Sequence, residues 1–372
     1  MKMAYKKLGD VCEILDSKRI PITASERKSG QYPYYGANGV QDYVSDFIFD
    51  DELVLLAEDG GNFGSKDRPI AYRVSGKCWV NNHAHVLKPL PDIDVDYLCY
   101  ALMFYDTTGL INGATRQKLT QSAMRQMQIP IRSLDEQKAI VQKISTATGL
   151  ITLRKTQLQK LDQLASSRFI EMFGDPIENP KGWKQSTIGA ECYYIKDGPH
   201  KSPTYVEEGG IPFISTRNVV AGDGIDWQTA KYISEHDYQE CIRKCHPVKG
   251  DILYSKGGTT GIARLVETDR KFANWVHVAV LKFGQQLNGK FFESMLNSRC
   301  CYLQSQRLTK GIANRDFVLS SIAQVIIIVP PLELQNEFAA FIEQLDKSKV
   351  TIRKSIEKLE TTYRALLQEY FG

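Results

Sequence analysis

Two distant segments of this chain are related versions of one another. Residues 129–144 read IPIRSLDEQKAIVQKI, and residues 327–342 read IIVPPLELQNEFAAFI. Each passes from an apolar, β-like tripeptide through Leu and an acidic residue to a Gln that begins a long helical pattern. Gln137 corresponds to Gln335 at an offset of 335 − 137 = 198. Because the fold must accommodate both copies of so long an element, this duplication constrains the fold more than any other feature.

Both helical patterns end alike, on Phe-Gly at 173–174 and at 371–372. Within each pattern, residues recur at alternating steps of three and four, which is the spacing of a coiled-coil seam. The second seam is almost unbroken, whereas the first contains two Ala and two Arg. The seam positions are Ile144, Ala147, Ile151, Arg154, Leu158, Leu161, Ala165, Arg168 and Met172 in the first copy, and Ile342, Leu345, Lys349, Ile352, Ile356, Leu359, Tyr363, Leu366 and Tyr370 in the second.

An amphipathic stripe of this length needs a partner of similar length. Each helix could pack on its own domain, but the other copy is the partner that matches it. In an antiparallel pair, the start of each helix would meet the end of the other. The pattern therefore favours a helix pair formed within one chain.

The segments outside the helices also resemble each other. Residues 83–88 read HAHVLK and residues 277–282 read HVAVLK, and an apolar strand pattern precedes Gly-Gly at both 60–61 and 257–258. Strand-like runs alternate with Gly, Asn and Asp turns, and helical patterns occur near 94–106 and 289–308. We therefore expect an α+β fold with a pseudo-twofold internal repeat, in which two similar mixed α/β domains are separated by the helix pair.

The expected organisation has four segments. They are a first mixed α/β domain at 1–128, a central helix at 129–174, a second mixed α/β domain at 175–326 and a C-terminal helix at 327–372.

Composition is that of an ordinary globular protein, with 42% hydrophobic and 24% charged residues. The N-terminus lacks the apolar stretch of a signal peptide, and the longest apolar run, 325–329, is too short to span a bilayer. The eight Cys follow no framework spacing, so we expect reduced thiols in a cytoplasmic protein. A net charge of +4 neither requires nor excludes a nucleic-acid partner.

Catalytic motifs are scarce. The sequence has no Walker A loop, no G-x-G-x-x-G fingerprint, no N-P-P-aromatic motif and no G-x-S-x-G elbow. Asp10 with Glu26-x-Lys28 is a loose match to a metal-dependent nuclease. Cys241-x3-Cys245-His246 resembles half of a zinc site, but no second pair follows. Two His at 83 and 85 would share one face of a strand, but no third metal ligand is evident.

Glu58-Asp59 precedes a glycine loop, and the second domain has Ser255-Lys256 at that place. A catalytic pair should be present in both copies, so we interpret these carboxylates as part of a turn.

The element order and the motifs resemble the DNA-specificity (S) subunit of type I restriction-modification enzymes. The quoted IPIRSLDEQ and VPPLELQ are similar to the family's P-x-P-x-L-x-E-Q boundary, and YPYYGANG at 32–39 also recurs in such domains. This chain has Arg132 where a second Pro is usual, and Leu334 where Glu is usual. The resemblance covers essentially the whole chain and implies two target-recognition domains joined by helices that pair as an antiparallel coiled coil.

The resemblance also implies a function. The chain would be a non-catalytic subunit without cofactor or metal that reads a bipartite, asymmetric target in double-stranded DNA, one half-site per domain. Its expected partners are two methyltransferase (M) subunits and, in the full complex, motor-nuclease (R) subunits. Two alternatives stay open, namely a nuclease or methyltransferase that acts alone and a structural protein that dimerises through its coiled coil.

Residues that read DNA should be polar, should lie in Gly-punctuated loops and should differ between the two domains. In the first domain these are Tyr35, Asn38, Asn62, Lys66, Arg68, Asn81, Asn82, Arg116 and Lys118. In the second domain they are Lys196, His200, Lys201, Thr216, Arg217, Asn218, Lys256, Thr259, Thr260, Asn274, Asn314 and Arg315.

Overall fold

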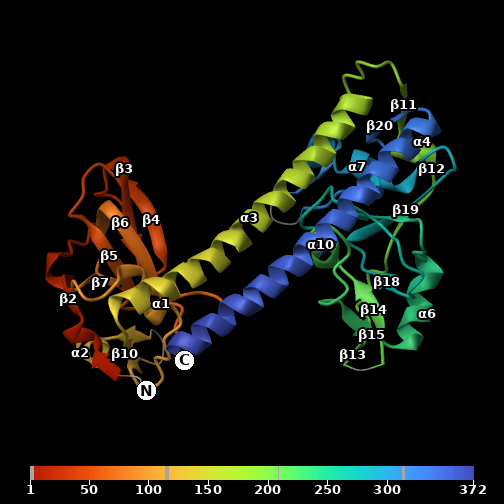
Figure 1. Ribbon diagram of the computed structural model, residues 1–372. Coiled ribbons are helices and arrows are strands. Elements are labelled where there is room, and N and C mark those ends of the chain that lie inside the picture. The colour runs from red at the N-terminus through yellow and green to blue at the C-terminus, as the bar shows by residue number, and fades with distance from the viewer. Residues whose placement is uncertain (1–3, 114–116, 208, 312–314) are drawn as a thin grey trace. The chain divides into compact units, whose positions relative to one another are not determined.

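The computed structural model describes residues 4–113, 117–207, 209–311 and 315–372. Its contacts divide the chain into two compact units, Met1–Lys155 with Lys354–Gly372, and Thr156–Arg353. Each unit contains one mixed α/β domain and part of each of two 40-residue helices, α3 (Leu134–Phe173) and α10 (Leu332–Phe371) (Figure 1). The mixed α/β class expected from the sequence is thereby confirmed. The two units are described separately below.

The first domain is built around a six-stranded sheet in the order β2-β7-β5-β6-β3-β4. Strands β1 and β10 form a separate antiparallel pair, as do β8 and β9. The elements are β1 (Ala4–Lys7), β2 (Cys12–Ile14), β3 (Ser29–Gly36), β4 (Gly39–Val44), β5 (Phe49–Ala57), β6 (Ala71–Val80), β7 (Ala84–Pro89), α1 (Val95–Met103), β8 (Ile111–Asn112), β9 (Lys118–Leu119), α2 (Gln121–Arg125) and β10 (Gln128–Ile131), with 3-10 turns at Leu8–Asp10 and Asp16–Lys18.

Strand β5 is the centre of this sheet because both of its faces are covered. Val54 and Leu56 point into one apolar cluster, which also contains Leu98 of α1. Leu53 and Leu55 point into a second cluster on the opposite face. A strand with two buried faces reads as a continuous apolar run instead of alternating, which explains the sequence LVLL.

The second domain has two four-stranded sheets, β12-β19-β16-β17 and β13-β15-β14-β18, and the separate pair β11-β20. Its elements are β11 (Lys184–Thr187), α4 (Ile188–Glu191), β12 (Cys192–Asp197), β13 (Tyr205–Val206), β14 (Ile211–Ile214), α5 (Thr216–Val220), β15 (Lys231–Ile233), α6 (Glu235–Lys244), β16 (Ile252–Ser255), β17 (Ala263–Leu265), β18 (Ala273–Asn274), β19 (Val278–Phe283), α7 (Gly289–Leu296), α8 (Arg299–Leu308), α9 (Leu319–Ile322) and β20 (Ile326–Val329).

The two domains share a series of strand pairings. β1 pairs with β10 as β11 pairs with β20, and both pairs are antiparallel. The antiparallel order β2-β7-β5 is matched by β12-β19-β16, and the parallel pair β3-β6 is matched by β14-β18. The helix expected near 94–106 is α1, but the pattern over 289–308 is two helices. The break lies at Asn297-Ser298, where the Ser298 side chain caps α8.

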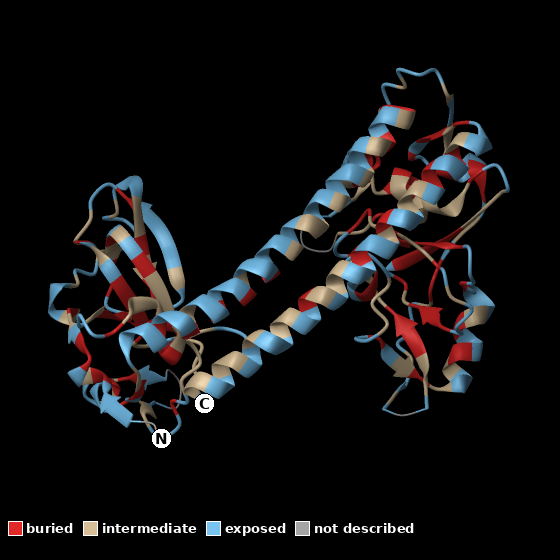
Figure 2. Ribbon diagram, viewed as in Figure 1, coloured by how far each residue is buried: buried red, intermediate tan, exposed pale blue. Residues whose placement is uncertain are grey.

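The long helices begin three residues before the glutamines that the sequence pattern emphasises. Ser133 caps α3, since its hydroxyl accepts from the Glu136 amide at 3.3 Å while the Glu136 carboxylate accepts from the Ser133 amide at 2.9 Å. All eighteen predicted seam positions are buried or half-buried, whereas most other positions of both helices are exposed (Figure 2).

Contacts between α3 and α10 run in opposite directions along the two helices. In the first unit, Lys143 Nζ donates to Tyr370 Oη at 3.0 Å, and Lys155 is 3.1 Å from Glu360. In the second unit, Arg168 is 3.0 Å from Glu337, and Asp162 is 2.5 Å from Lys349. In each unit, later residues of α3 therefore meet earlier residues of α10, which is antiparallel packing.

The repeated glutamine has the same role in both units. Gln137 is fully buried; its Oε1 accepts from the Asp94 amide at 2.8 Å, and its Nε2 donates to the carbonyls of Asp92 and Arg132 at 3.0 Å. One side chain thus joins the first turn of α3 to the loop that begins α1 and to the end of β10.

Gln335 makes the corresponding set of bonds in the second unit. It is also fully buried; its Oε1 accepts from the Asn288 amide at 2.8 Å, and its Nε2 donates to the carbonyls of Gln286 and Pro330. Each glutamine fixes the direction in which a long helix leaves its own domain.

The Phe-Gly endings also have a packing role. Phe173 is fully buried and its ring lies 4.7 Å from that of Phe291 on α7. Phe371 lies 5.0 Å from Tyr97 on α1, by ring centroids. The end of α3 therefore packs on α7, which comes before α10 in the chain, and the end of α10 packs on α1, which comes before α3.

We predict that Gln335→Leu lowers the free energy of unfolding of the second unit by roughly 2–4 kcal/mol. The change keeps the approximate size of the side chain but leaves one amide and two carbonyls without their partner. The matched control is Gln344→Leu, because Gln344 is an exposed glutamine on the same helix. Urea unfolding followed by circular dichroism measures both variants. Equal stability of the two would contradict the role assigned to Gln335.

Candidate nucleic-acid interface

Three connecting loops of the first domain and strand β9 meet beyond the ends of the sheet strands, and we call them the first loop set. The β3-β4 turn is joined to the β5-β6 loop because Asn38 Nδ2 donates to the Gly60 carbonyl at 3.0 Å and Asn62 Nδ2 donates to Asn38 Oδ1 at 3.1 Å. The β6-β7 turn and strand β9 join them through main-chain bonds to Glu58, whose amide donates to the His83 carbonyl at 2.9 Å and whose carbonyl accepts from the Leu119 amide at 2.7 Å.

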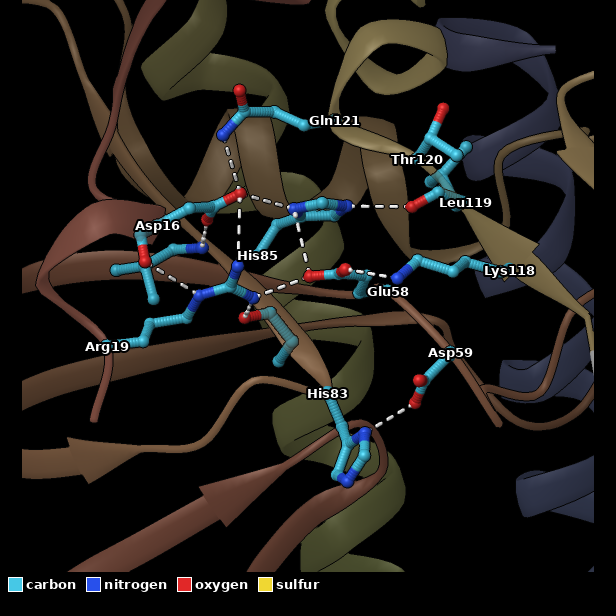
Figure 3. A network of polar contacts seen from close by, with 12 residues as sticks. Asp16, Arg19, Glu58, Asp59, His83, His85, Lys118, Leu119, Thr120 and Gln121 are labelled. Carbon is cyan, nitrogen blue, oxygen red and sulfur yellow. Dashed lines mark hydrogen bonds and ion pairs between the residues drawn. The ribbon is translucent and has the colours of Figure 1, made fainter. Parts of the chain in front are cut away.

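A network of ionised side chains lies beneath these loops (Figure 3). Arg19 Nη1 is 2.7 Å from Glu58 Oε2, and Lys118 Nζ is 3.0 Å from Glu58 Oε1. Arg19 also donates to the carbonyls of Asp16 and Ala84. The network therefore joins the turn after β2 to the ends of β5 and β9.

His85 lies at the centre of this network and is 1% exposed in its side chain. Its Nδ1 is 2.6 Å from Asp16 Oδ2, and its Nε2 is 2.9 Å from the Leu119 carbonyl oxygen. Both neighbours can accept a hydrogen bond, so both ring nitrogens have a partner in the network. The ring lies between Asp16 and Glu58, since Glu58 Oε2 is 3.7 Å from Nδ1.

The carboxyl groups of the network are held in their ionised form. Burial opposes ionisation of Asp16, but the hydrogen bond and charge of His85 together hold its pKa below the ordinary value. Burial also opposes ionisation of Glu58, yet hydrogen bonds from Arg19 and Lys118 lower its pKa overall. Glu58 is therefore part of an ion network, whereas the sequence pattern predicts only a turn at this position.

Asp16, Glu58 and His85 also have the geometry of a metal-binding group, with ligand atoms within 4.8 Å of one another. The surrounding charges do not fit a cation, however. Arg19 and Lys118 already neutralise Glu58, and both nitrogens of His85 already have hydrogen-bond partners. A metal ion would have to displace these groups, so we interpret the cluster as structural.

The second domain assembles the corresponding loops. The Lys256 amide donates to the His277 carbonyl at 2.9 Å, and the Lys256 carbonyl accepts from the Phe317 amide at 2.7 Å. The Gly258 amide donates to the Arg315 carbonyl, and Thr216 Oγ1 donates to the His277 carbonyl. An added Cβ at Gly257 would lie 2.1 Å from the His277 ring, so the loop can approach this turn so closely only with glycine.

The main-chain bonds of the two loop sets correspond one to one. Glu58 and Lys256 occupy the same position, because the amide of each donates to a His carbonyl, of His83 or His277, and the carbonyl of each accepts from the amide of Leu119 or Phe317. The sequence had aligned Glu58-Asp59 with Ser255-Lys256, which is one residue out of register. The structure therefore places a carboxylate in one domain where the other has an ammonium group.

The predicted DNA-reading residues that the structure describes fall into three classes of exposure. Exposed side chains are Asn38, Lys66, Arg68, Asn82, Lys118, Lys196, His200, Lys201, Arg217 and Thr259. Half-buried side chains are Tyr35, Asn62, Thr216 and Arg315. Buried side chains are Asn81, Asn218, Lys256, Thr260 and Asn274. Arg116 and Asn314 lie outside the described residues.

The buried candidates have internal partners. Asn81 donates to Gln41 at 3.1 Å, Asn218 donates to the Asp226 carbonyl at 3.0 Å and Asn274 donates to the Val278 carbonyl at 2.8 Å. These amides shape the loops from within. We therefore leave the five buried side chains out of the set that we propose to contact DNA.

The half-zinc pattern of the second domain consists of buried thiols. Cys241 and Cys245 are each less than 5% exposed, and burial raises the pKa of Cys245 to about 11. Within the part of the chain that the structure describes, no helix is long and apolar enough to cross a membrane.

Two contributors to the interface could not be identified by residue type alone. Arg19 does not lie in a Gly-punctuated loop, and Asp316 is negatively charged. Neither residue was therefore among the DNA-reading residues predicted from the sequence. The internal repeat relates Asp316 to Lys118, because these positions differ by 198 residues, as Gln335 and Gln137 do.

We predict that the first unit loses stability as the pH falls from about 5 towards 3. The pKa values of Asp16 and Glu58 are depressed in the folded state. The unfolded chain therefore takes up protons first, at about pH 4, and folding free energy is lost with falling pH.

Glu58→Gln should lower stability at pH 7 by roughly 2 kcal/mol and should reduce the further loss in acid, because one of the responsible carboxyl groups is gone. Glu13→Gln, at an exposed position of β2, is the control. Urea titrations at pH 7 and pH 3.5 provide the comparison. An acid-induced loss as large in Glu58→Gln as in the unmodified chain would refute the assignment.

Comparison with known proteins gives consistent results. The family model described as "Type I restriction modification DNA specificity domain" matches residues 2–163 and again residues 180–361. A Haemophilus influenzae protein described as a type I restriction enzyme specificity subunit is 26% identical, over 99% of this chain and 96% of its own length. The MjaIX specificity subunit of Methanocaldococcus jannaschii is 25% identical, over 97% of this chain and 91% of its own.

Solved structures have the same fold. The S subunit of the type I restriction-modification system from M. genitalium aligns with a TM-score of 0.60 at 16% identity, covering 100% of this chain and 97% of that one. A structure from a study of complex assembly and conformational transition of the type I system aligns at a TM-score of 0.58 and 17% identity, covering 100% and 99%.

Proposed function

This chain belongs to the family of type I restriction-modification DNA-specificity subunits, and we propose that it reads a bipartite, asymmetric DNA target with one half-site per domain. One observation carries this proposal. The DNA-specificity family model matches the chain twice, and each matched region contains a loop set with corresponding main-chain hydrogen bonds. Because the side chains on that frame differ, the two half-sites should differ in sequence.

The exposed polar groups of each loop set are suited to duplex DNA. Asn38, Asn82 and Lys118 offer donors and acceptors on the first domain. Arg217 and Thr259 do so on the second, where Lys196 and Lys201 add positive charge for phosphates. These residues lie on turns, on the short strands β9 and β12 and on the five-residue helix α5, and we propose that these segments together read the DNA.

We propose the domain boundaries given by the sequence, with recognition domains at 1–128 and 175–326 and helical segments at 129–174 and 327–372. In this proposal the helices form one antiparallel coiled coil that sets the distance between half-sites. The buried Gln137 and Gln335 support it, since each rigidly joins a helix to the domain that precedes it.

The chain would act without chemistry of its own, in the cytoplasm, in a complex with two methyltransferase subunits and, for restriction, motor-nuclease subunits. We assign the docking of a partner subunit to α3, whose exposed apolar side chains such a partner would bury. These are Leu134, Leu150, Leu153, Leu164 and Ile170, which are 36–55% exposed.

We predict that the purified chain alone neither methylates nor cleaves DNA. Together with a methyltransferase subunit and S-adenosylmethionine it should methylate a target made of two short sequences and an unread spacer. Sequencing of methylated genomic DNA gives the motif. Catalysis by the rigorously purified chain would support the stand-alone enzyme, and an uninterrupted motif would exclude a bipartite reader.

We also predict that one added heptad in each of α3 and α10 lengthens the unread spacer. Seven residues extend a helix by roughly 10 Å, which corresponds to about three base pairs. The seam register survives a heptad insertion, so the chain should still fold. The motif methylated by the double insertion is compared with that of the original chain, and an unchanged spacer would show that the helices do not set the distance.

A further inference from the structure

The loop sets of the two domains contain the same ion pair with its charges reversed. In the first domain, Lys118 Nζ is 3.0 Å from Glu58 Oε1. In the second, Asp316 Oδ1 is 3.1 Å from Lys256 Nζ, an ion pair without hydrogen-bond geometry. Residues 58 and 256 correspond through their main-chain bonds, and 118 and 316 correspond through the antiparallel bridges Asp59↔Lys118 and Gly257↔Asp316.

In each pair one member is buried and the other faces solvent. The Glu58 and Lys256 side chains are 13% and 7% exposed, whereas those of Lys118 and Asp316 are 50% and 47% exposed. The surface of the first loop set thus presents an ammonium group at the place where the second presents a carboxylate. The buried partner offsets the charge of the exposed group and restricts the position of the exposed side chain.

The main chain beneath both exposed groups is held in place. Lys118 begins β9 and pairs with Asn112 of β8. The Asp316 amide and carbonyl both bond to Lys310, each at 2.9 Å. Groups that are anchored by backbone bonds and by one ion pair lose little conformational entropy when they bind, which suits a contact that must discriminate.

We infer that Lys118 and Asp316 are specificity-determining residues that read opposite kinds of base edge, an inference that rests on the proposed function. Lys118 donates to an acceptor, such as the O6 and N7 atoms of guanine. Asp316 accepts from an amino group, which only cytosine N4 and adenine N6 offer in the major groove. The two domains therefore require different bases at corresponding positions of their half-sites.

A phosphate contact is a poorer assignment for Asp316, because a carboxylate near a phosphate is repelled. At the proposed DNA-reading surface, a base amino group is the partner that suits its negative charge. For Lys118 a phosphate is chemically possible, and the experiment separates the two cases. Loss of a base contact changes the preference at one position, whereas loss of a phosphate contact weakens binding to all sequences and reduces its salt dependence.

The test uses the full complex with its methyltransferase subunits. Methylation rates are measured on duplexes in which each position of each half-site is changed in turn. Asp316→Asn keeps the size of the side chain but removes its charge and replaces one acceptor oxygen with a donor. It should therefore change discrimination about tenfold at one position of one half-site, by weakening a preference for cytosine or by shifting the preference towards adenine. Lys118→Met should reduce discrimination about tenfold at one position of the other half-site.

Controls separate reading from folding. Asp269→Asn and Lys7→Met change exposed groups of the same types outside the loop sets and should leave every preference unchanged. Asp316→Glu keeps the carboxylate and should keep the preference for an amino group, even where Asp316→Asn proves too unstable to assay. Melting temperatures of all variants are recorded.

Two results would overturn the inference. One is an unchanged position profile for Asp316→Asn or Lys118→Met in a folded, assembled complex. The other is a uniform loss across all duplexes with a weaker salt dependence, which would assign phosphate contacts. A failure of the proposed function is a different result, because the original chain itself would then direct methylation to no two-part target.

Discussion

The arrangement of each unit depends on one buried amide. Gln137 and Gln335 each satisfy an amide and two carbonyls that two separate segments bring to one point. An apolar residue could fill the space but would leave those groups unpaired, and a shorter amide would not reach all three. A requirement for both length and two kinds of hydrogen-bonding atom explains why Gln stands at both positions.

The two loop sets combine a shared arrangement of main-chain hydrogen bonds with different exposed side chains. Their approach is fixed by main-chain bonds, which do not depend on side-chain identity, and by glycine at Gly257, where a side chain would collide with His277. The ion pair between the loops requires only opposite charges, in either order. Side chains at the edge can therefore change in sign between domains without any change in the strands beneath them.

Regular patterns made much of the fold predictable. A seam at steps of three and four identified both long helices and their inward faces, because periodicity is a local property of the sequence. The break at Asn297-Ser298 went unpredicted because the apolar stripe continues across it, although Ser298 is a favourable N-cap. Some residues predicted to lie in loops are elsewhere, such as Tyr35 in β3 and Arg217 in α5, and the burial of Asn218 and Lys256 was not predicted from the sequence. The partners of Lys256 lie at positions 197 and 316, and only the fold brings them together.

The division of both helices between the two units has a consequence for unfolding. Each unit includes one end of α3 and the opposite end of α10, so neither unit can melt completely without removing a turn of helix on which the other depends. Helix propagation is cooperative, and fraying that begins in one unit continues along the same hydrogen-bonded ladder. The stabilities of the two units are therefore expected to be coupled through the shared helices, so that a change that destabilises one unit also lowers the unfolding temperature of the other.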